Sequence, residues 1–246
     1  MAPLWLGIAL AAVAAPAAAQ CVKQSPPHAV ALVELYTSEG CSSCPPADRW
    51  LSRLLGDGPG ADSVVPLAFH VDYWDRLGWK DRFASRRFTE RQYRLARQAR
   101  SRAVYTPGVF LNFAEFRRWG SVHFAEAVRA INAKPARADI RLQLDAPSPS
   151  QLAIKAAFRG PPASQAFVAL YENNLATEVK AGENTGATLR HDYVVREWLG
   201  PIEVPGKLEK TVALQADWKA GDLGVAAFVQ DGPALLQATA LAGCSG

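Results

Sequence analysis

The spacing of apolar residues divides the chain into two halves. In the first half, apolar runs at 30–36 and 64–71 flank a stretch, 47–55, with helical periodicity. Near-continuous apolar runs joined through a helix are typical of a buried parallel β-α-β unit. The sequence therefore predicts two parallel strands with a helix between them.

Three further elements complete the first half. The segment 81–102 contains no Pro or Gly and predicts a long helix with one apolar stripe. Residues 104–112 predict a turn into a third strand, and a short strand is expected at 116–119. A last helix is expected at 122–131.

The pattern changes after residue 136. Apolar and polar residues then alternate in short runs separated by turn clusters, at 140–144, 152–158, 167–171, 193–198, 208–214 and 223–229. Short strands at this spacing are typical of an antiparallel β-sandwich. We therefore expect an α/β domain over 20–136 and a β-sandwich domain over 137–246.

The first nineteen residues predict a secretory signal peptide. An Ala- and Leu-rich stretch is broken at Pro16 and followed by small residues before Gln20. The alternative is an N-terminal membrane anchor, since no Lys or Arg precedes the apolar run. The stretch is short for a span and contains Pro, so cleavage is preferred. The mature protein is then periplasmic or secreted, without a stable membrane anchor.

Composition and charge narrow the class of protein but do not indicate a function. Apolar residues make up 49% of the chain and charged residues 20%, as in a folded soluble protein. The net charge of +4 is mild, but residues 76–102 hold ten Lys and Arg against two acids. This segment is interpreted as a solvated helix face; an anionic partner is the alternative. Together with export, the charge gives no indication of nucleic-acid binding.

Candidate chemistry centres on Cys41-Ser42-Ser43-Cys44, which is followed by Pro45-Pro46. Two cysteines three apart, between a strand and a helix, indicate a redox site. Cys41, expected at the exposed end of the turn, is the candidate nucleophile, and Cys44 the resolving thiol. Four cysteines allow three pairings; the spacing favours Cys41–Cys44, which leaves a structural bridge between Cys21 and Cys244.

The order of these elements resembles the thioredoxin-like fold, followed here by a C-terminal antiparallel β-sandwich. In that fold a cis-proline faces the active disulfide, which implies this role for Pro107 after Thr106. The match is closer to the DUF1223 family, predicted secreted bacterial proteins. It is carried by the segment 34–48 around the cysteines, by 70–79 (His-Val-Asp-Tyr-Trp-Asp-Arg-Leu-Gly-Trp) and by Tyr-Thr-Pro at 105–107. The resemblance implies a fold more firmly than a reaction.

Several alternatives remain beside the redox interpretation. Asp72 or Asp75, after the second strand, is a candidate proton shuttle for a buried thiol. Cys41, Cys44 and His70 could together bind copper(I), because thiolates select soft ions. The cysteines could also form a static disulfide in a binding module. No histidine pair shows metal-ligand spacing, and no phosphate loop, serine-nucleophile motif or dinucleotide fingerprint is present.

These observations predict an exported thiol–disulfide oxidoreductase that uses Cys41 and Cys44. Its partners would be a protein or peptide thiol or disulfide and a second redox protein. No cofactor and no bound metal are expected. The sequence does not indicate whether the site oxidises, reduces or isomerises its substrate, because the potential depends on contacts of the thiolate.

Overall fold

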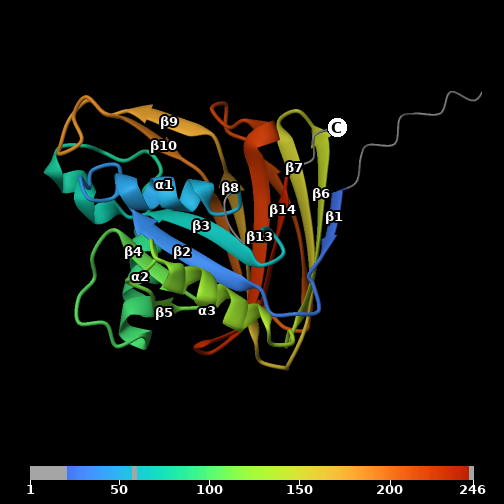
Figure 1. Cartoon of the computed structure of the whole chain (residues 1–246). Helices are drawn as coiled ribbons and strands as arrows, with labels where there is room; N and C mark the ends of the chain where they lie inside the picture. Colours follow the sequence, from blue (N-terminus) through green and yellow to red (C-terminus); the bar gives the residue numbers. More distant parts are fainter. Residues whose placement is uncertain (1–20, 57–59, 244–246) are drawn as a thin grey trace, which may run out of the picture.

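Two buried parallel strands, β2 (Ala31–Thr37) and β3 (Val64–His70), lie at the centre of a mixed sheet. The structure is a computed structural model that describes residues 21–56 and 60–243 (Figure 1). Every residue of β2 and β3 is buried, as expected for strands covered on both faces. On the far side of β2, the antiparallel β4 (Gly108–Leu111) and then β5 (Ala114–Glu115) complete that edge.

The same sheet continues on the other side of β3 with strands from the second half of the chain. β11 (Val194–Glu203) pairs with β3 in parallel at Val194 and Ala68. Three antiparallel neighbours follow in the order β8 (Gln165–Glu172), β13 (Leu223–Asp231) and β14 (Ala234–Ala242). The result is one eight-stranded sheet that contains strands from both halves.

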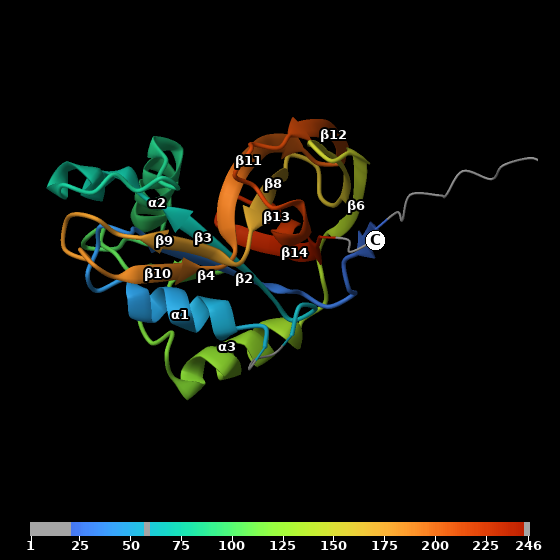
Figure 2. The ribbon, with the colours of Figure 1, turned by 90° about the horizontal axis from the view of Figure 1, so that it is seen from above.

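A second, four-stranded sheet packs against the far end of the first (Figure 2). Its order is β1 (Cys21–Gln24), β6 (Asp139–Ser148), β7 (Gln151–Arg159) and β12 (Gly206–Ala213). Alternate residues such as Ile140 and Ile154 meet Val168 and Val225 of the large sheet in a common core. This alternation follows from the two-residue period of side chains along a strand.

The helices pack on the part of the large sheet built around β2. On one face, α1 (Pro45–Arg53) and α3 (Val122–Asn132) share a core with Val33 and Leu35. On the other face, α2 (Arg86–Gln98) shares a core with Leu32 and Tyr36. The remaining elements are the 3₁₀ turns η1 (Asp72–Leu77) and η2 (Ala220–Asp222) and the hairpin of β9 (Leu175–Glu178) and β10 (Thr188–His191).

The expected fold class, a thioredoxin-like α/β domain followed by a β-sandwich domain, is wrong. The described chain is predominantly β-sheet, and β11, β8, β13 and β14 extend the sheet of β2 and β3. The core around Phe69 likewise includes Trp198 and Phe228 from the second half. The second half therefore does not form a separate sandwich; part of it continues the central sheet.

Local elements differ from expectation mainly around residues 72–102. The helix expected over 81–102 is limited to 86–98 and is preceded by η1 and an irregular segment. The predicted signal peptide at 1–19 and the N-terminal anchor alternative lie outside the described residues. Within residues 21–56 and 60–243, no helix is both long and apolar enough to cross a membrane.

Candidate functional site

Three chain segments meet at one end of the central strands, where β2 and β3 finish and β4 starts. Because β2 and β3 are parallel, with Thr37 opposite His70, both strands end there. β4 is antiparallel to β2, and Gly108 pairs with Tyr36, so β4 begins at the same edge. The turn that carries the cysteines, η1 and the Thr106-Pro107 segment are therefore neighbours. The carboxyl ends of parallel strands are where α/β proteins commonly place their sites.

The cysteine turn, residues 38–44, leads directly into α1. Cys41 and Cys44 are joined by a disulfide, and Cys44 is the N-cap residue of the helix. Pro45 and Pro46 occupy the first two helical positions. Proline is tolerated there because N–H groups of the first turn have no partner within the helix. The Ser43 Oγ lies 3.4 Å from the Cys41 Sγ.

Both cysteines are fully buried, whereas Ser42 between them is exposed. This differs from the expectation that Cys41 occupies the exposed end of the turn. One cover is Trp74 of η1, whose Nε1 donates to Thr106 Oγ1 at 2.8 Å. A Cβ added at Gly40 would lie 3.3 Å from the Trp74 Cβ, so the indole side chain packs closely on the cysteine turn.

A second cover comes from the loop of residues 179–187 between β9 and β10. Ser42 donates to the Glu183 carboxylate through its N–H at 3.1 Å and its hydroxyl at 2.7 Å. These bonds lower the pKa of Glu183. The Asn184 amide donates to the carbonyl oxygens of Glu39 and Cys41 at 2.8 and 3.0 Å. We call these four hydrogen bonds the loop latch; no sequence motif indicated it.

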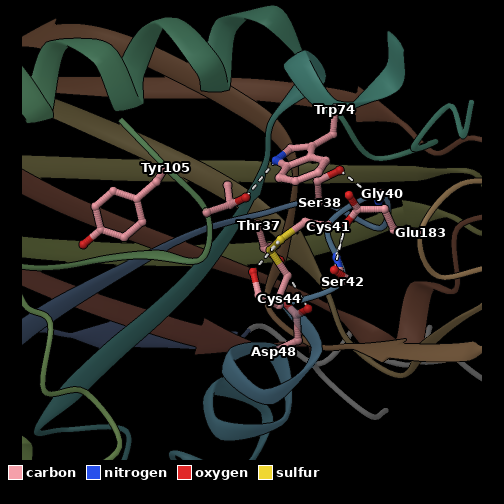
Figure 3. The surroundings of a disulfide bond; sticks show 12 residues. Thr37, Ser38, Gly40, Cys41, Ser42, Cys44, Asp48, Trp74, Tyr105 and Glu183 are labelled. Carbon is pink, nitrogen blue, oxygen red and sulfur yellow. Dashed lines mark hydrogen bonds between the residues drawn. A yellow bond between two sulfur atoms is a disulfide. The ribbon is translucent and has the colours of Figure 1, made fainter. Parts of the chain in front are cut away.

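Figure 3 shows the disulfide between Trp74 and Asp48, with Glu183 beside Ser42. Thr106 is buried, Pro107 is half-buried, and the peptide bond between them is cis. The Gln92 amide of α2 donates to the Tyr105 carbonyl at 2.7 Å and so fixes the segment before Thr106.

The two predicted proton shuttles contact other groups. Asp72 accepts from Thr89 Oγ1 at 2.6 Å, next to the start of α2. Asp75 accepts from the Asp81 N–H at 3.2 Å, and partial burial raises its pKa. In the described chain, neither carboxylate makes a hydrogen bond or ion pair with the cysteine turn.

Sequence reasoning missed Asp48, the buried carboxylate beside Cys44. It lies one helical turn after Cys44, on the buried face of α1 with Ala47 and Leu51. Its N–H donates to the Cys44 carbonyl at 3.2 Å, and its carboxylate accepts from Thr37 Oγ1 at 3.2 Å. Burial raises the pKa of Asp48. In the sequence, Asp48 could have been noticed as an acidic residue on the otherwise apolar face of the predicted helix, four residues after a cysteine.

Asp48 belongs to a larger group of ionisable side chains in the interior. We call it the acid–histidine cluster; its members, each 0–5% exposed, are Glu39, Asp48, His70, Asp81 and His191. The Nδ1 of His70 lies 2.7 Å from Asp81. The ring of His70 packs edge-on against His191, with centroids 4.9 Å apart.

The copper(I) alternative finds no support in this arrangement. His70 contacts Asp81 and His191 in the cluster rather than the two sulfur atoms. Among the residues that the structure describes, no three His, Cys, Asp or Glu side chains are placed to hold a metal ion.

The predicted bridge between Cys21 and Cys244 lies partly outside the described residues. Cys21 lies in β1, whereas Cys244 is not among the described residues.

The Arg-rich segment is mostly exposed, as predicted, with one exception. Arg91 is buried and binds the Glu34 carboxylate of β2 through Nε at 2.8 Å and Nη2 at 2.6 Å. Its guanidinium also lies 4.6 Å from the Trp198 ring centroid. By contrast, Arg86 is 84% exposed.

Residues 32–230 match the model of a family described as "Protein of unknown function (DUF1223)". A solved protein from Agrobacterium tumefaciens is 28% identical, over 89% of this chain and 97% of its own, with a TM-score of 0.64. HBP35 of Porphyromonas gingivalis is 14% identical, over 88% and 76%, with a TM-score of 0.61, and is similar in fold alone. No curated protein matches the chain.

Proposed function

The chain belongs to the DUF1223 family, whose function is not established, and from the chemistry of its site we propose that it is a thiol–disulfide oxidoreductase. The reactive pair is Cys41 and Cys44, and the substrate is a thiol or disulfide of a protein or peptide. We further propose that the protein acts in the periplasm or outside the cell after signal cleavage, and that a second redox protein restores the pair. No nucleic acid takes part.

The observation that carries this proposal is the position of the disulfide at the start of α1. Cys44 is the N-cap residue, and the positive end of the helix dipole stabilises a thiolate there. The Ser43 hydroxyl can donate to a Cys41 thiolate from its present distance of 3.4 Å. A disulfide whose reduced thiolates are stabilised in this way is easier to reduce.

We assign the two sulfur atoms different roles. Cys41 precedes the helix, next to the exposed Ser42, and forms the mixed disulfide with substrate. Cys44 is the N-cap residue of α1, one turn before the buried Asp48, and resolves that mixed disulfide. Thr106 and Pro107, joined to the site through Trp74, form the wall along which a substrate chain would lie.

Substrate access requires movement, because both cysteines are fully buried. The loop of residues 179–187 is the part that we expect to move. Glu183 and Ser42 are exposed, and the loop latch consists of hydrogen bonds alone. Hydrogen bonds at an exposed site exchange readily for bonds to water, so opening them costs little net free energy. Opening residues 179–187 would uncover the turn without disturbing the central sheet.

A trapping experiment tests this function. The full mature chain with Cys44→Ser is incubated with oxidised glutathione and analysed by intact mass and peptide mapping. We expect a stable mixed disulfide on Cys41, because the resolving thiol is absent. Cys41→Ser is the matched control and should form the adduct far more slowly.

The second candidate is a binding module with a structural disulfide. Its supporting observation is that neither cysteine has exposed surface in the oxidised protein. In that case Cys44→Ser forms no adduct beyond the level of the Cys41→Ser control. The wild-type disulfide then also resists reduction by glutathione.

A further inference from the structure

The acid–histidine cluster has more ionisable groups than packing requires, and it lies directly beneath the disulfide. Its members come from five segments: the cysteine turn, α1, the end of β3, the residues after η1, and the end of β10. Burying a charged group costs several kcal/mol unless a partner compensates for it. Five such groups in one dry interior therefore call for an explanation.

One part of the cluster is a close ion pair, although the Nε2 of His70 makes no hydrogen bond within the described residues. The Asp81 carboxylate contacts His70 Nδ1 at 2.7 Å and accepts from the N–H groups of Glu39 and Phe83 at 2.8 and 2.9 Å. Burial alone would lower the pKa of His70, but Asp81 outweighs it and raises that pKa. The same contacts lower the pKa of Asp81 against the effect of burial. This pair has the character of a fixed, structural ion pair.

The other part is incompletely paired. His191 lies between two carboxylates, with Nε2 3.6 Å from Glu39 and Nδ1 3.9 Å from Asp48. Neither ring nitrogen makes a hydrogen bond within the described structure, and Glu39 Oε1 is also without one. His191 therefore lies next to Asp48 with both ring nitrogens free of hydrogen bonds among the described residues.

Asp48 connects this loosely paired part to the disulfide. It follows Cys44 by four residues, which places both side chains on one face of α1. The groups that face Asp48 are the Thr37 hydroxyl of β2, His191 of β10, His70 of β3 and, further off, Asp81. In the view of Figure 3, Asp48 and Thr37 lie on the side of the disulfide away from Trp74.

We propose that Asp48, which lies beside His191, is the proton acceptor and donor for Cys44. This inference rests on the proposed function, because it concerns the resolving step of the same disulfide. Resolution by a buried thiol needs such a group, since the thiolate is the reactive form and water does not reach Cys44.

In the mixed disulfide, Cys41 Sγ is bonded to the substrate sulfur and Cys44 is a thiol. Asp48 takes the Cys44 proton, and the Cys44 thiolate attacks Cys41 Sγ. The Cys41–Cys44 bond forms as the bond to substrate breaks, so the cysteine pair is oxidised and the substrate leaves as a thiolate that solvent protonates. In the reverse direction, Asp48 returns the proton to Cys44.

The test measures the resolving step in wild type and Asp48→Asn over pH 5 to 9. Reduced full-length protein reacts with oxidised glutathione, and acid-quenched samples separate the mixed disulfide from the closed disulfide. We expect Asp48→Asn to slow closure at least about tenfold at neutral pH and to change its pH profile, while Cys41 forms the mixed disulfide at an unchanged rate. Asp62→Asn, the same change at an exposed site, should leave both steps unchanged.

A second measurement needs no variant. Infrared difference spectra between the oxidised and reduced wild type should contain a band from a buried protonated carboxyl group. Superimposable pH profiles for wild type and Asp48→Asn, or a difference spectrum without a carboxyl band, would overturn the inference and leave the oxidoreductase intact. If the wild-type cysteines do not exchange with glutathione at all, the proposed function fails, and this inference fails with it.

Discussion

The buried contact between Asp81 and His70 makes the stability of the folded protein depend on pH. The raised pKa of His70 stabilises the folded state below pH 6.5, and this is lost as the pH rises through the folded-state pKa. The lowered pKa of Asp81 stabilises the fold above pH 3.8, and this is lost as the pH falls through its folded-state pKa. Both contributions are present together between about pH 4 and 6.5.

Replacing His70 with Gln should therefore destabilise the protein most strongly near pH 5. A broken buried ion pair costs about 3–5 kcal/mol, because the remaining carboxylate stays buried without its partner. The difference in unfolding free energy from wild type should shrink above the pKa of His70. Urea denaturation at several pH values measures it, with His123→Gln at an exposed site as control. A difference independent of pH would contradict this assignment.

At this scale the sequence indicated some site residues and not others. The cysteine pair and Thr106-Pro107 were recognisable because each is a short motif of residues that are close together in the sequence. Asp48 was not, since an acid in the first turn of a helix is ordinary and stabilises the helix dipole. Its burial depends on Thr37 and His191, which approach it only in the folded chain.

Among the elements, the β9–β10 hairpin most directly affects access to the disulfide. Its loop latch joins residues more than 140 positions apart in sequence, Asn184 to Cys41 and Glu183 to Ser42. Such contacts leave no trace in local periodicity. Residues 182–186 belong to the turn clusters between the expected strands, and the contact of this loop with the cysteine turn became evident only from the structure.

Removing the latch should speed reduction of the disulfide. Asn184→Ala deletes the donor to the Glu39 and Cys41 carbonyls, so the loop should open more often. We expect a severalfold faster reduction by a small phosphine reductant, followed by free-thiol labelling. Lys180→Ala, in the same loop but outside the latch and ion-paired with Glu178, is the matched control. An unchanged rate in Asn184→Ala would show that the latch does not limit access.

Helix boundaries were predictable to within two residues where apolar spacing decides them: α1 was expected at 47–55 and lies at 45–53, and α3 was expected at 122–131 and lies at 122–132. The segment 81–85 was expected to be helical but is irregular, because Asp81 is held by His70 and by two backbone N–H groups. These tertiary contacts outweigh local helix propensity, which is weak per residue. The arginines of α2 were correctly expected on the surface, except for Arg91, which docks the helix on Glu34.

For the whole molecule, the continuous eight-stranded sheet has the largest consequence. β3 and β11 lie side by side, and the core around Phe69 includes Trp198 and Phe228. The sequence indicated most of the strands but not which of them pair, because pairing between distant strands is set by tertiary contacts. The predicted fold class, with the strands after residue 136 in a β-sandwich of their own, was wrong for that reason.

The intact protein should therefore unfold as one cooperative unit. Residues 20–136 expressed alone would lose β11, one of the two partners of β3, together with the residues that the second half contributes to the shared core. Residues 137–246 alone would lose the residues that the first half contributes. We expect neither piece to give a cooperative transition in scanning calorimetry, whereas the intact chain gives one. Two independent transitions in the intact chain would contradict this conclusion.

A redox titration of the purified mature protein tests the central claim, that Cys41 and Cys44 form a reactive pair. The fraction of free thiol is measured in buffers of defined reduced and oxidised thiol, with Cys41→Ser and Cys44→Ser identifying the signal. We predict a two-electron midpoint potential well above about −300 mV, where labile disulfides lie. A midpoint below about −300 mV, typical of structural disulfides, would contradict it.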